Sequence, residues 1–286
     1  MTTPPPVLHR VARPGGSLAV EVAGDGPLVV CLPGMGELRS SWRHTAPGLR
    51  AAGYRVATVD LRGHGDSDAT FPAYDDVAAG TDALAVVEHL GGGPAVLVGS
   101  SMGAGAAAWA AAERPDLVAG LALVGPFVRD PRVSPLLRLA LRITMGGPWS
   151  SRVWTSYLPS LYPGRRPEDL DAHLAAVRES LRRPGRTRAF RATTRTSHGP
   201  VEARLGEVRA PVLVVMGDAD PDWPDPVAEG RWVADRLGGE LLLVPGAGHF
   251  PHVQHPEVVT PALAAFLGRV APTARPAPRP ALHPGA

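Results

Sequence analysis

The chain has 286 residues, of which 44% are hydrophobic, so it is long enough to bury a sizeable core. Its formal net charge is only +2 and it contains no lysine, which argues against a nucleic-acid partner. No stretch approaches the ~20 apolar residues of a membrane span, and the single cysteine, Cys31, excludes an intramolecular disulfide. We therefore expect a cytoplasmic globular protein that acts on a small molecule, with no membrane or nucleic-acid partner; the composition leaves its oligomeric state open.

The first half of the chain alternates between strand-like and helix-like patterns. The apolar run at 28–32, bounded by Gly-Pro and Pro-Gly pairs, has the pattern of a strand buried on both faces. The predicted elements up to residue 125 are strands at 7–10, 17–22, 28–32, 55–60, 95–98 and 121–124, and helices at 41–52, 75–90 and 104–112. This alternation predicts an α/β fold with a mostly parallel, doubly wound sheet.

The alternation stops at Gly125-Pro126 and returns only at Pro211. Residues 126–210 have no convincing strand pattern and are predicted to form an inserted helical cap, with helices at 134–144, 149–157, 168–182 and 185–196. The pattern of the core then resumes with strands at 212–216 and 240–244 and helices at 226–237 and 256–270. The core thus comprises residues 1–125 and 211–270, and the Pro-, Ala- and Arg-rich residues 271–286 are predicted to be a disordered tail.

One short stretch, Gly99-Ser100-Ser101-Met102-Gly103, lies between an apolar run and an Ala-rich segment. That order predicts a strand, a sharp turn and a helix, with glycines two positions either side of Ser101 removing the Cβ atoms that would clash in the bend. Ser101 is therefore the candidate nucleophile, whereas Ser100 is not at the right offsets between the glycines. A glycine-rich chain can produce such a match by chance, so the motif also needs an acid and a histidine later in the sequence.

Two later strands are each followed by one of these residue types. Gly217-Asp218-Ala219-Asp220 follows the strand at 212–216, and Gly248-His249 follows the strand at 240–244. Because the carboxyl ends of parallel strands lie at one edge of a sheet, Ser101, an acid and His249 can meet there. A serine hydroxyl needs an imidazole to accept its proton, and the imidazole needs a carboxylate to hold its tautomer. We favour Asp220 as the acid over Asp218, Asp222 and Asp225, and His249 as the base over His252 and His255, which are expected at the start of the last helix.

Taken together, these motifs resemble the α/β-hydrolase superfamily over nearly the whole chain except the tail and much of the cap. The matching pieces are Gly34-Met35-Gly36, the run from Asp60 to Gly65, the elbow at 99–103, the acid loop at 217–220 and Gly248-His249. The resemblance implies an eight-stranded sheet and a serine hydrolase in which Ser101 is the nucleophile, Asp220 the orienting acid and His249 the base. It also implies an oxyanion hole formed by the backbone amides of Met35 and Met102. Members of the superfamily often have a histidine where this chain has Pro33, but the donor at Met35 is a main-chain group and does not need it.

The remaining candidates favour structural interpretations. We expect the loop at 62–66, with His64 between two glycines, to be a turn that packs beside the elbow. No set of His, Cys or carboxylate residues has the spacing of a metal site, and Gly34-Met35-Gly36 lacks the Gly-Lys-Ser/Thr ending of a phosphate loop. We therefore expect neither a cofactor nor a metal.

The cap is expected to determine specificity, because a lid over the sheet edge shapes the pocket and excludes water. Its candidate pocket residues are Trp149, Trp154, Tyr157 and Leu158, which could equally form the cap's own core. We predict hydrolysis of an ester or related acyl bond in a small, largely apolar molecule through an acyl-serine. Two alternatives stay open: the same triad could catalyse carbon–carbon bond hydrolysis, lyase or perhydrolase chemistry, or the chain could be a non-catalytic, receptor-like ligand-binding protein.

Overall fold

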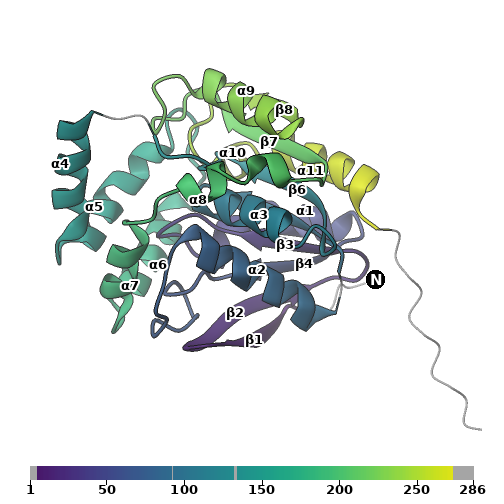
Figure 1. Ribbon diagram of the computed structural model, residues 1–286, viewed down its shortest axis with the longest axis horizontal. Coiled ribbons are helices and arrows are strands. Elements are labelled where there is room, and N and C mark those ends of the chain that lie inside the picture. The colour runs from purple at the N-terminus through teal and green to yellow at the C-terminus, as the bar shows by residue number, and fades with distance from the viewer. Residues whose placement is uncertain (1–4, 92, 132–133, 273–286) are drawn as a thin grey trace, which may run out of the picture.

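The computed structural model describes residues 5–91, 93–131 and 134–272, and these form one eight-stranded sheet covered by helices (Figure 1). The strand order is β1-β2-β4-β3-β5-β6-β7-β8, antiparallel at the β1–β2 and β2–β4 pairs and parallel at the others. The strands are β1 (Val7–Arg13), β2 (Gly16–Ala23), β3 (Leu28–Leu32), β4 (Arg55–Val59), β5 (Ala95–Ser100), β6 (Val118–Val124), β7 (Val212–Gly217) and β8 (Glu240–Val244). The predicted fold class, a mostly parallel doubly wound sheet, is confirmed.

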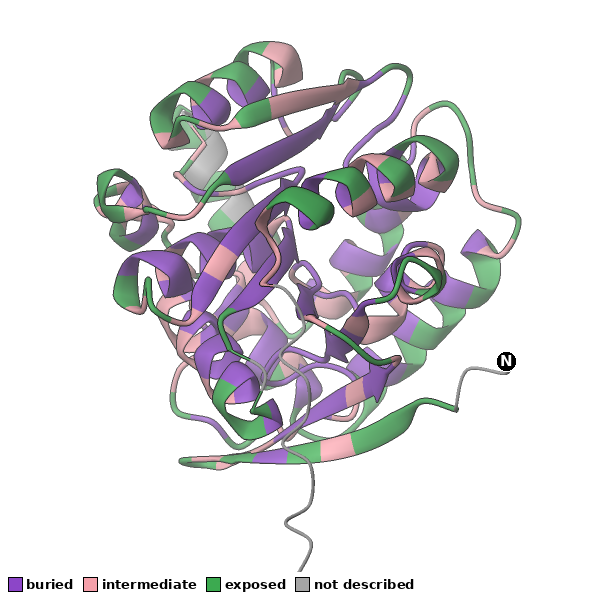
Figure 2. Cartoon of the chain, turned by 90° about the vertical axis from the view of Figure 1, so that its right-hand side faces the viewer, coloured by how far each residue is buried: buried purple, intermediate pink, exposed green. Residues whose placement is uncertain are grey.

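The central strands are apolar along their whole length because helices cover both faces of the sheet. In β3, Val30 packs into the apolar cluster on one face and Val29 into the cluster on the other, as the two-residue period of a strand requires. Figure 2 shows these inner strands buried and β1 exposed at the edge. The core helices are α1 (Ala46–Ala51), α2 (Asp76–Leu90), α3 (Met102–Glu113), α9 (Pro226–Leu237), α10 (Pro251–Gln254) and α11 (Pro256–Val270).

The predicted helix at 41–52 is instead two short elements. A 3₁₀ helix, η1 (Arg39–Trp42), is followed by α1, which has Pro47 in its first turn. Proline lacks an amide hydrogen and its ring clashes with a preceding helical turn, so it is accommodated at the start of a helix and not in its interior. The short helix α10 had no signal in the sequence pattern.

The cap segment, residues 126–210, contains only helices among its described residues. They are α4 (Pro135–Gly146), α5 (Ser150–Tyr157), η2 (Leu158–Leu161), α6 (Leu170–Arg182), α7 (Arg186–Thr193), α8 (Gly199–Glu202) and η3 (Leu205–Glu207). Figure 1 shows α4 to α7 grouped at one end of the molecule. The last two elements lie elsewhere, since Val201 and Leu205 pack into the same apolar cluster as α2 and α3.

Two further observations concern membrane-spanning helices and the C-terminal tail. Within the described ranges, no helix has the length and apolar content needed to cross a bilayer. Of the tail predicted to be disordered, residues 273–286 lie outside the described part of the chain.

Candidate active site

Ser101 stands at the junction of β5 and α3 with φ 55° and ψ −124°. Among the described residues it is the one non-glycine residue with a positive φ, a conformation that costs about 1–3 kcal/mol and persists only where the surroundings impose it. Its amide N–H donates to Val124 O at 2.9 Å, which anchors the turn to β6. The turn that carries Ser101 is therefore fixed at the carboxyl ends of β5 and β6.

The two flanking glycines are required by close backbone contacts. A Cβ atom on Gly99 would lie 2.2 Å from the carbonyl oxygen of Gly103. A Cβ atom on Gly103 would lie 2.5 Å from the carbonyl oxygens of Leu32 and Pro33, at the end of β3. Because backbone atoms cannot move aside as a side chain can, no larger residue fits either position.

His249 and Asp220 form a buried pair beside this turn. The distance from His249 Nδ1 to Asp220 Oδ2 is 2.8 Å, and each residue is 2% exposed. The Asp222 N–H donates to the other carboxylate oxygen of Asp220 at 3.0 Å, so Asp220 is oriented from both sides. In the neutral imidazole the proton is therefore on Nδ1, and the lone pair of Nε2 is free to accept a proton.

Two carboxylates affect the pKa of His249. Burial by itself lowers this pKa, but the charges of Asp220 and Asp222 outweigh burial and raise it to about 9. Asp222 Oδ2 is 3.6 Å from His249 Nδ1, and burial raises the pKa of Asp222 itself. The other two candidate acids have local roles: Asp218 accepts the Gly246 N–H, and Asp225 caps α9.

The segment after β6 joins the serine turn to the histidine. The Phe127 N–H donates to Ser101 O at 3.3 Å, and the Phe127 ring centroid is 5.6 Å from that of His249. A Cβ on Gly125 would lie 2.7 Å from the carbonyl oxygen of His249. In the described part of the chain the Ser101 hydroxyl has no hydrogen-bond partner. Catalytic hydrogen bonds are often long without substrate and shorten in the complex.

We name residues Gly34 to Glu37 the oxyanion turn, because they include Met35, which is predicted to be an oxyanion donor. The Glu37 N–H donates to Gly34 O at 3.2 Å, and Gly36 has φ 72°, which is the arrangement of a type II turn. A Cβ on Gly34 would lie 2.8 Å from Ser101 Cβ, so the turn lies directly against the serine. Neither the Met35 N–H nor the Met102 N–H has an acceptor among the described residues, and Met102 is also the first residue of α3, where the helix dipole favours negative charge.

Comparison with known proteins agrees with this fold. Residues 29–262 match the model of the alpha/beta hydrolase family. The chain belongs to that family. It is 33% identical to a pimeloyl-acyl-carrier-protein methyl ester esterase of Chromobacterium violaceum, over 88% of this chain and 98% of the relative.

Solved structures of similar fold include other hydrolases. The enol-lactonase of Burkholderia xenovorans has a TM-score of 0.78 at 20% identity, over 91% of this chain and all of that chain (100%). The 2-hydroxy-6-oxo-6-phenylhexa-2,4-dienoate hydrolase of a Rhodococcus species has a TM-score of 0.77 at 21% identity, over 93% and 100%. At these identities the likeness concerns the fold.

The four cap residues predicted to line the pocket of this α/β hydrolase differ in their surroundings. Trp154 covers the oxyanion turn, because a Cβ on Gly36 would lie 2.2 Å from Trp154 Nε1. Tyr157 OH donates to Asp222 Oδ1, and thus contacts the acid loop. Leu158 is fully buried in the apolar cluster of the cap segment, and Trp149 is 48% exposed.

Three buried histidines have contacts that were not predicted from the sequence. His173 in α6 pairs with Glu37 of the oxyanion turn at 2.7 Å, and His64 accepts the Gly36 N–H at 3.0 Å. His252 is fully buried and its ring centroid is 4.4 Å from that of Trp42, instead of simply starting the last helix. Nothing local in the sequence pairs Glu37 with a residue so far along the chain, whereas the glycines around His64 did mark a tight turn.

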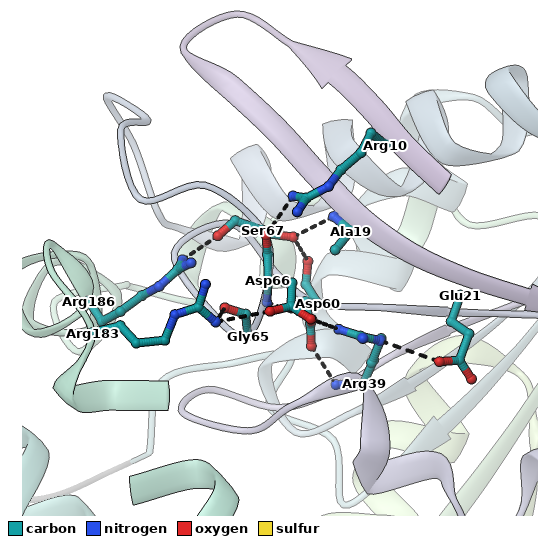
Figure 3. A network of polar contacts seen from close by, with 10 residues as sticks. All are labelled: Arg10, Ala19, Glu21, Arg39, Asp60, Gly65, Asp66, Ser67, Arg183 and Arg186. Carbon is teal, nitrogen blue, oxygen red and sulfur yellow. Dashed lines mark hydrogen bonds and ion pairs between the residues drawn. The ribbon is translucent and has the colours of Figure 1, made fainter. Parts of the chain in front are cut away.

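A surface groove of about 570 Å³ lies apart from the triad, between η1, α1 and α6. Neither Ser101 nor His249 lines it, and two of its arginines already have acidic partners: Arg39 pairs with Asp60, and Arg43 with Asp169. Figure 3 shows the polar network along this side, from Glu21 and Arg39 to the arginines of the cap segment. The groove is therefore separate from the candidate triad.

One cluster in the described ranges has the spacing of a metal site. The ligand atoms of Asp220, Asp222 and His249 all lie within 4.8 Å of one another. The 2.8 Å separation of His249 from Asp220 is the length of a hydrogen bond, so a cation would have to displace the proton that orients the imidazole. The geometry of these three groups suits a histidine base better than a set of metal ligands.

Proposed function

We propose that this α/β hydrolase cleaves an ester or related acyl bond of a small, largely apolar molecule through an acyl-serine. The observation that carries the proposal is the strained Ser101 turn beside the buried His249–Asp220 pair. A strained, partly exposed serine next to an oriented imidazole is the arrangement that activates a hydroxyl as a nucleophile.

The first half of the reaction would form the acyl-serine. His249 Nε2 accepts the Ser101 proton as Oγ attacks the substrate carbonyl, and the carbonyl oxygen becomes an oxyanion. The N–H groups of Met35 and Met102 donate to that oxygen; losing one such donor typically costs about 10²–10³-fold in rate. The imidazolium then gives its proton to the leaving alcohol, and the carbon–oxygen bond breaks.

The second half would regenerate the enzyme. Water replaces the alcohol, His249 accepts a proton from it, and the resulting hydroxide attacks the acyl carbonyl. The carboxylic acid leaves as Ser101 recovers its proton from the imidazolium. Asp220 stays ionised throughout and stabilises the charged imidazole.

Aromatic side chains near the triad support a largely apolar substrate. The ring centroids of Phe127 and Trp223 are 4.8 Å apart, and Trp154 covers the oxyanion turn from the cap side. Ligand pockets are predominantly lined by such side chains, with few polar groups to orient the ligand. The esterase from C. violaceum supports an ester among the possible substrates.

A covalent probe and simple esters test the proposal. Purified protein is expected to react with a fluorophosphonate and to hydrolyse short p-nitrophenyl esters, and Ser101→Ala is expected to do neither. The absence of both reactions in the unmodified protein would overturn the proposal. A panel of acyl esters, thioesters and a lactone, assayed after active-site titration, then identifies the acyl class; strong labelling with negligible turnover of the panel would instead favour carbon–carbon bond hydrolysis by the same triad.

A further inference from the structure

His64 is bonded to the oxyanion turn through one ring nitrogen and to its own loop through the other. The Gly36 N–H donates to His64 Nε2 at 3.0 Å, while His64 Nδ1 is 3.0 Å from Arg62 O. A carbonyl oxygen can only accept, so Nδ1 carries the proton and Nε2 is the acceptor. His64 is 2% exposed, and burial lowers its pKa, which keeps the imidazole neutral as this pair of bonds requires.

The bond to His64 fixes the peptide at the centre of the oxyanion turn. Type I and type II turns differ mainly by a flip of that central peptide, here Met35–Gly36. With the Gly36 N–H held by His64, the peptide keeps the orientation seen in the structure. Gly34 O points into the turn toward the Glu37 N–H, so in a trans peptide the Met35 N–H points out of it.

The other sides of the turn are also constrained. Gly34 lies against Ser101 Cβ, and Gly36 lies against the Trp154 ring. Glu37 pairs with His173 of α6, and His64 accepts the Gly36 N–H. Removing the His64 imidazole would free the central peptide to rotate without creating any new acceptor for its N–H.

The loop that carries His64 is itself braced. Ser67 Oγ accepts the Ala19 N–H at 2.8 Å, and the Asp66 N–H donates to Asp60 Oδ2 at 2.9 Å. Two arginines of the cap segment bond to the same loop: Arg183 donates to Gly65 O at 2.8 Å, and Arg186 donates to Ser67 O (Figure 3). The loop is thus a stiff support that both the core and the cap segment hold in place.

We propose that His64 is a positioning residue, which fixes the Met35–Gly36 peptide so that the oxyanion turn keeps its place against Ser101 and the Met35 N–H of the adjoining peptide stays at the reacting carbonyl. His64 does not touch the substrate and acts only through Gly36. The inference rests on the proposed function, because it assigns the Met35 N–H as an oxyanion donor.

The hydrogen bond can be tested without any assay of activity. In nitrogen-15-labelled protein we expect a scalar coupling across the hydrogen bond between the Gly36 amide and His64 Nε2, and an Nε2 shift typical of an unprotonated nitrogen. Absence of the coupling, or a proton on Nε2, would overturn the inference even if the enzyme were an active esterase.

Two substitutions test the consequence for the reaction. His64→Leu removes the acceptor of the Gly36 N–H, whereas His64→Gln places a side-chain oxygen where Nε2 lies, which can accept the same bond. We expect His64→Leu to lower kcat for a p-nitrophenyl ester by about 10- to 100-fold, with KM changed by less than about threefold, because the defect is in transition-state geometry. His64→Gln should restore most of the lost kcat.

A control variant tests whether a general loss of stability lowers kcat, as opposed to the loss of the bond to Gly36. Val87→Ala removes buried methyl groups near the C-terminal end of α2. It should lower Tm and leave kcat per titrated active site unchanged. An unchanged kcat in His64→Leu, or equal losses of kcat in the Leu and Gln variants, would contradict the positioning role of His64. The proposed function would still stand if the fluorophosphonate labelled Ser101. If the wild-type protein is not labelled, the proposed function fails, and the role of His64 in catalysis fails with it.

Discussion

The edge of the sheet that carries Ser101, Asp220 and His249, which we call the catalytic edge, differs from the cap segment in the contacts that hold it in place. At the catalytic edge, glycines let backbone approach backbone, as at Gly99 and Gly103 around Ser101. The cap segment has a backbone bond to the core, from the His249 N–H to Leu161 O, but also part-exposed ion pairs, such as Arg43 with Asp169 and Arg183 with Asp66.

The kind of contact decides how narrowly the residues of each region are positioned. Backbone contacts have no rotamers to exchange, so the positions of the nucleophile and the oxyanion turn are narrowly set. Part-exposed ion pairs contribute only about 0–1 kcal/mol each, so the loss of either of these two pairs should cost little. The cap segment also exposes apolar side chains along α4, at Leu136 (78%), Leu139 (54%) and Ile143 (59%).

The largest effect is expected at the catalytic edge. Ser101→Ala should lower kcat/KM for an ester by about 10⁴-fold or more, because the nucleophile is lost. Ser100→Ala is the matched control: its hydroxyl is buried without a partner, and removing it should leave turnover within about threefold. Kinetics with active-site titration measure both, and the reverse order of effects would show that the wrong serine has been assigned.

Next come two glycine substitutions, one in each region. Gly103→Ala introduces a Cβ 2.5 Å from backbone oxygens and should destabilise the fold by about 3 kcal/mol. Gly146→Ala, at the end of α4, meets no atom within 4 Å and should change stability by less than about 1 kcal/mol. Urea denaturation compares the two, and similar losses would contradict the contrast between a backbone-packed edge and an open cap.

A smaller effect is expected in the pH profile. His249 acts as a base only when neutral, so kcat/KM should rise with pH to a midpoint near its pKa of about 9. Asp222→Asn removes a charge that holds the proton on His249, so the midpoint should move to lower pH and the activity at pH 7 should increase relative to the plateau.

Tyr157→Phe is the control for that shift, because it removes the contact from the cap segment to Asp222 but keeps the charge. Its midpoint should stay close to that of the wild type. A midpoint in Asp222→Asn that is unchanged, or moved to higher pH, would mean that Asp222 does not act on His249.

The smallest effect is expected where the cap segment meets η1. Asp169→Asn removes the charge that pairs with Arg43 and contacts His44, at a position with 42% of its side chain exposed. The free energy of unfolding should fall by less than about 1 kcal/mol, with kcat unchanged and the loss diminished at 1 M salt. A loss of several kcal/mol, measured by denaturation at low and high salt, would show that the cap is held as firmly as the catalytic edge.

Local sequence patterns were sufficient for much of the fold. Continuous apolar runs marked the inner strands, and the run at 212–216 corresponds to β7 within one residue. Prediction was less accurate where one residue alters a helix, as Pro47 does, and where burial comes from distant packing, as it does for His252 against Trp42.

The residues of the site likewise include some that local patterns could predict and some that only the packing reveals. Ser101, Asp220 and His249 could be proposed from their positions after predicted strands, because parallel strands bring their carboxyl ends together. The acid itself was one of several in its loop, and only the packed structure distinguishes the 2.8 Å contact of Asp220 from the 3.6 Å contact of Asp222.

The sequence by itself therefore indicated the family, the sheet and the residues of a candidate triad, because each depends on a pattern within a few neighbouring residues. Only the tertiary structure decided which groups hold that chemistry in place, as His64 holds Gly36 and His173 pairs with Glu37. These contacts join segments that are far apart along the chain, and they depend on how the loops and the cap segment pack at one edge of the sheet. A local pattern cannot encode such packing, since the same histidine in the same glycine-rich turn would have no partner until the oxyanion turn folds against it.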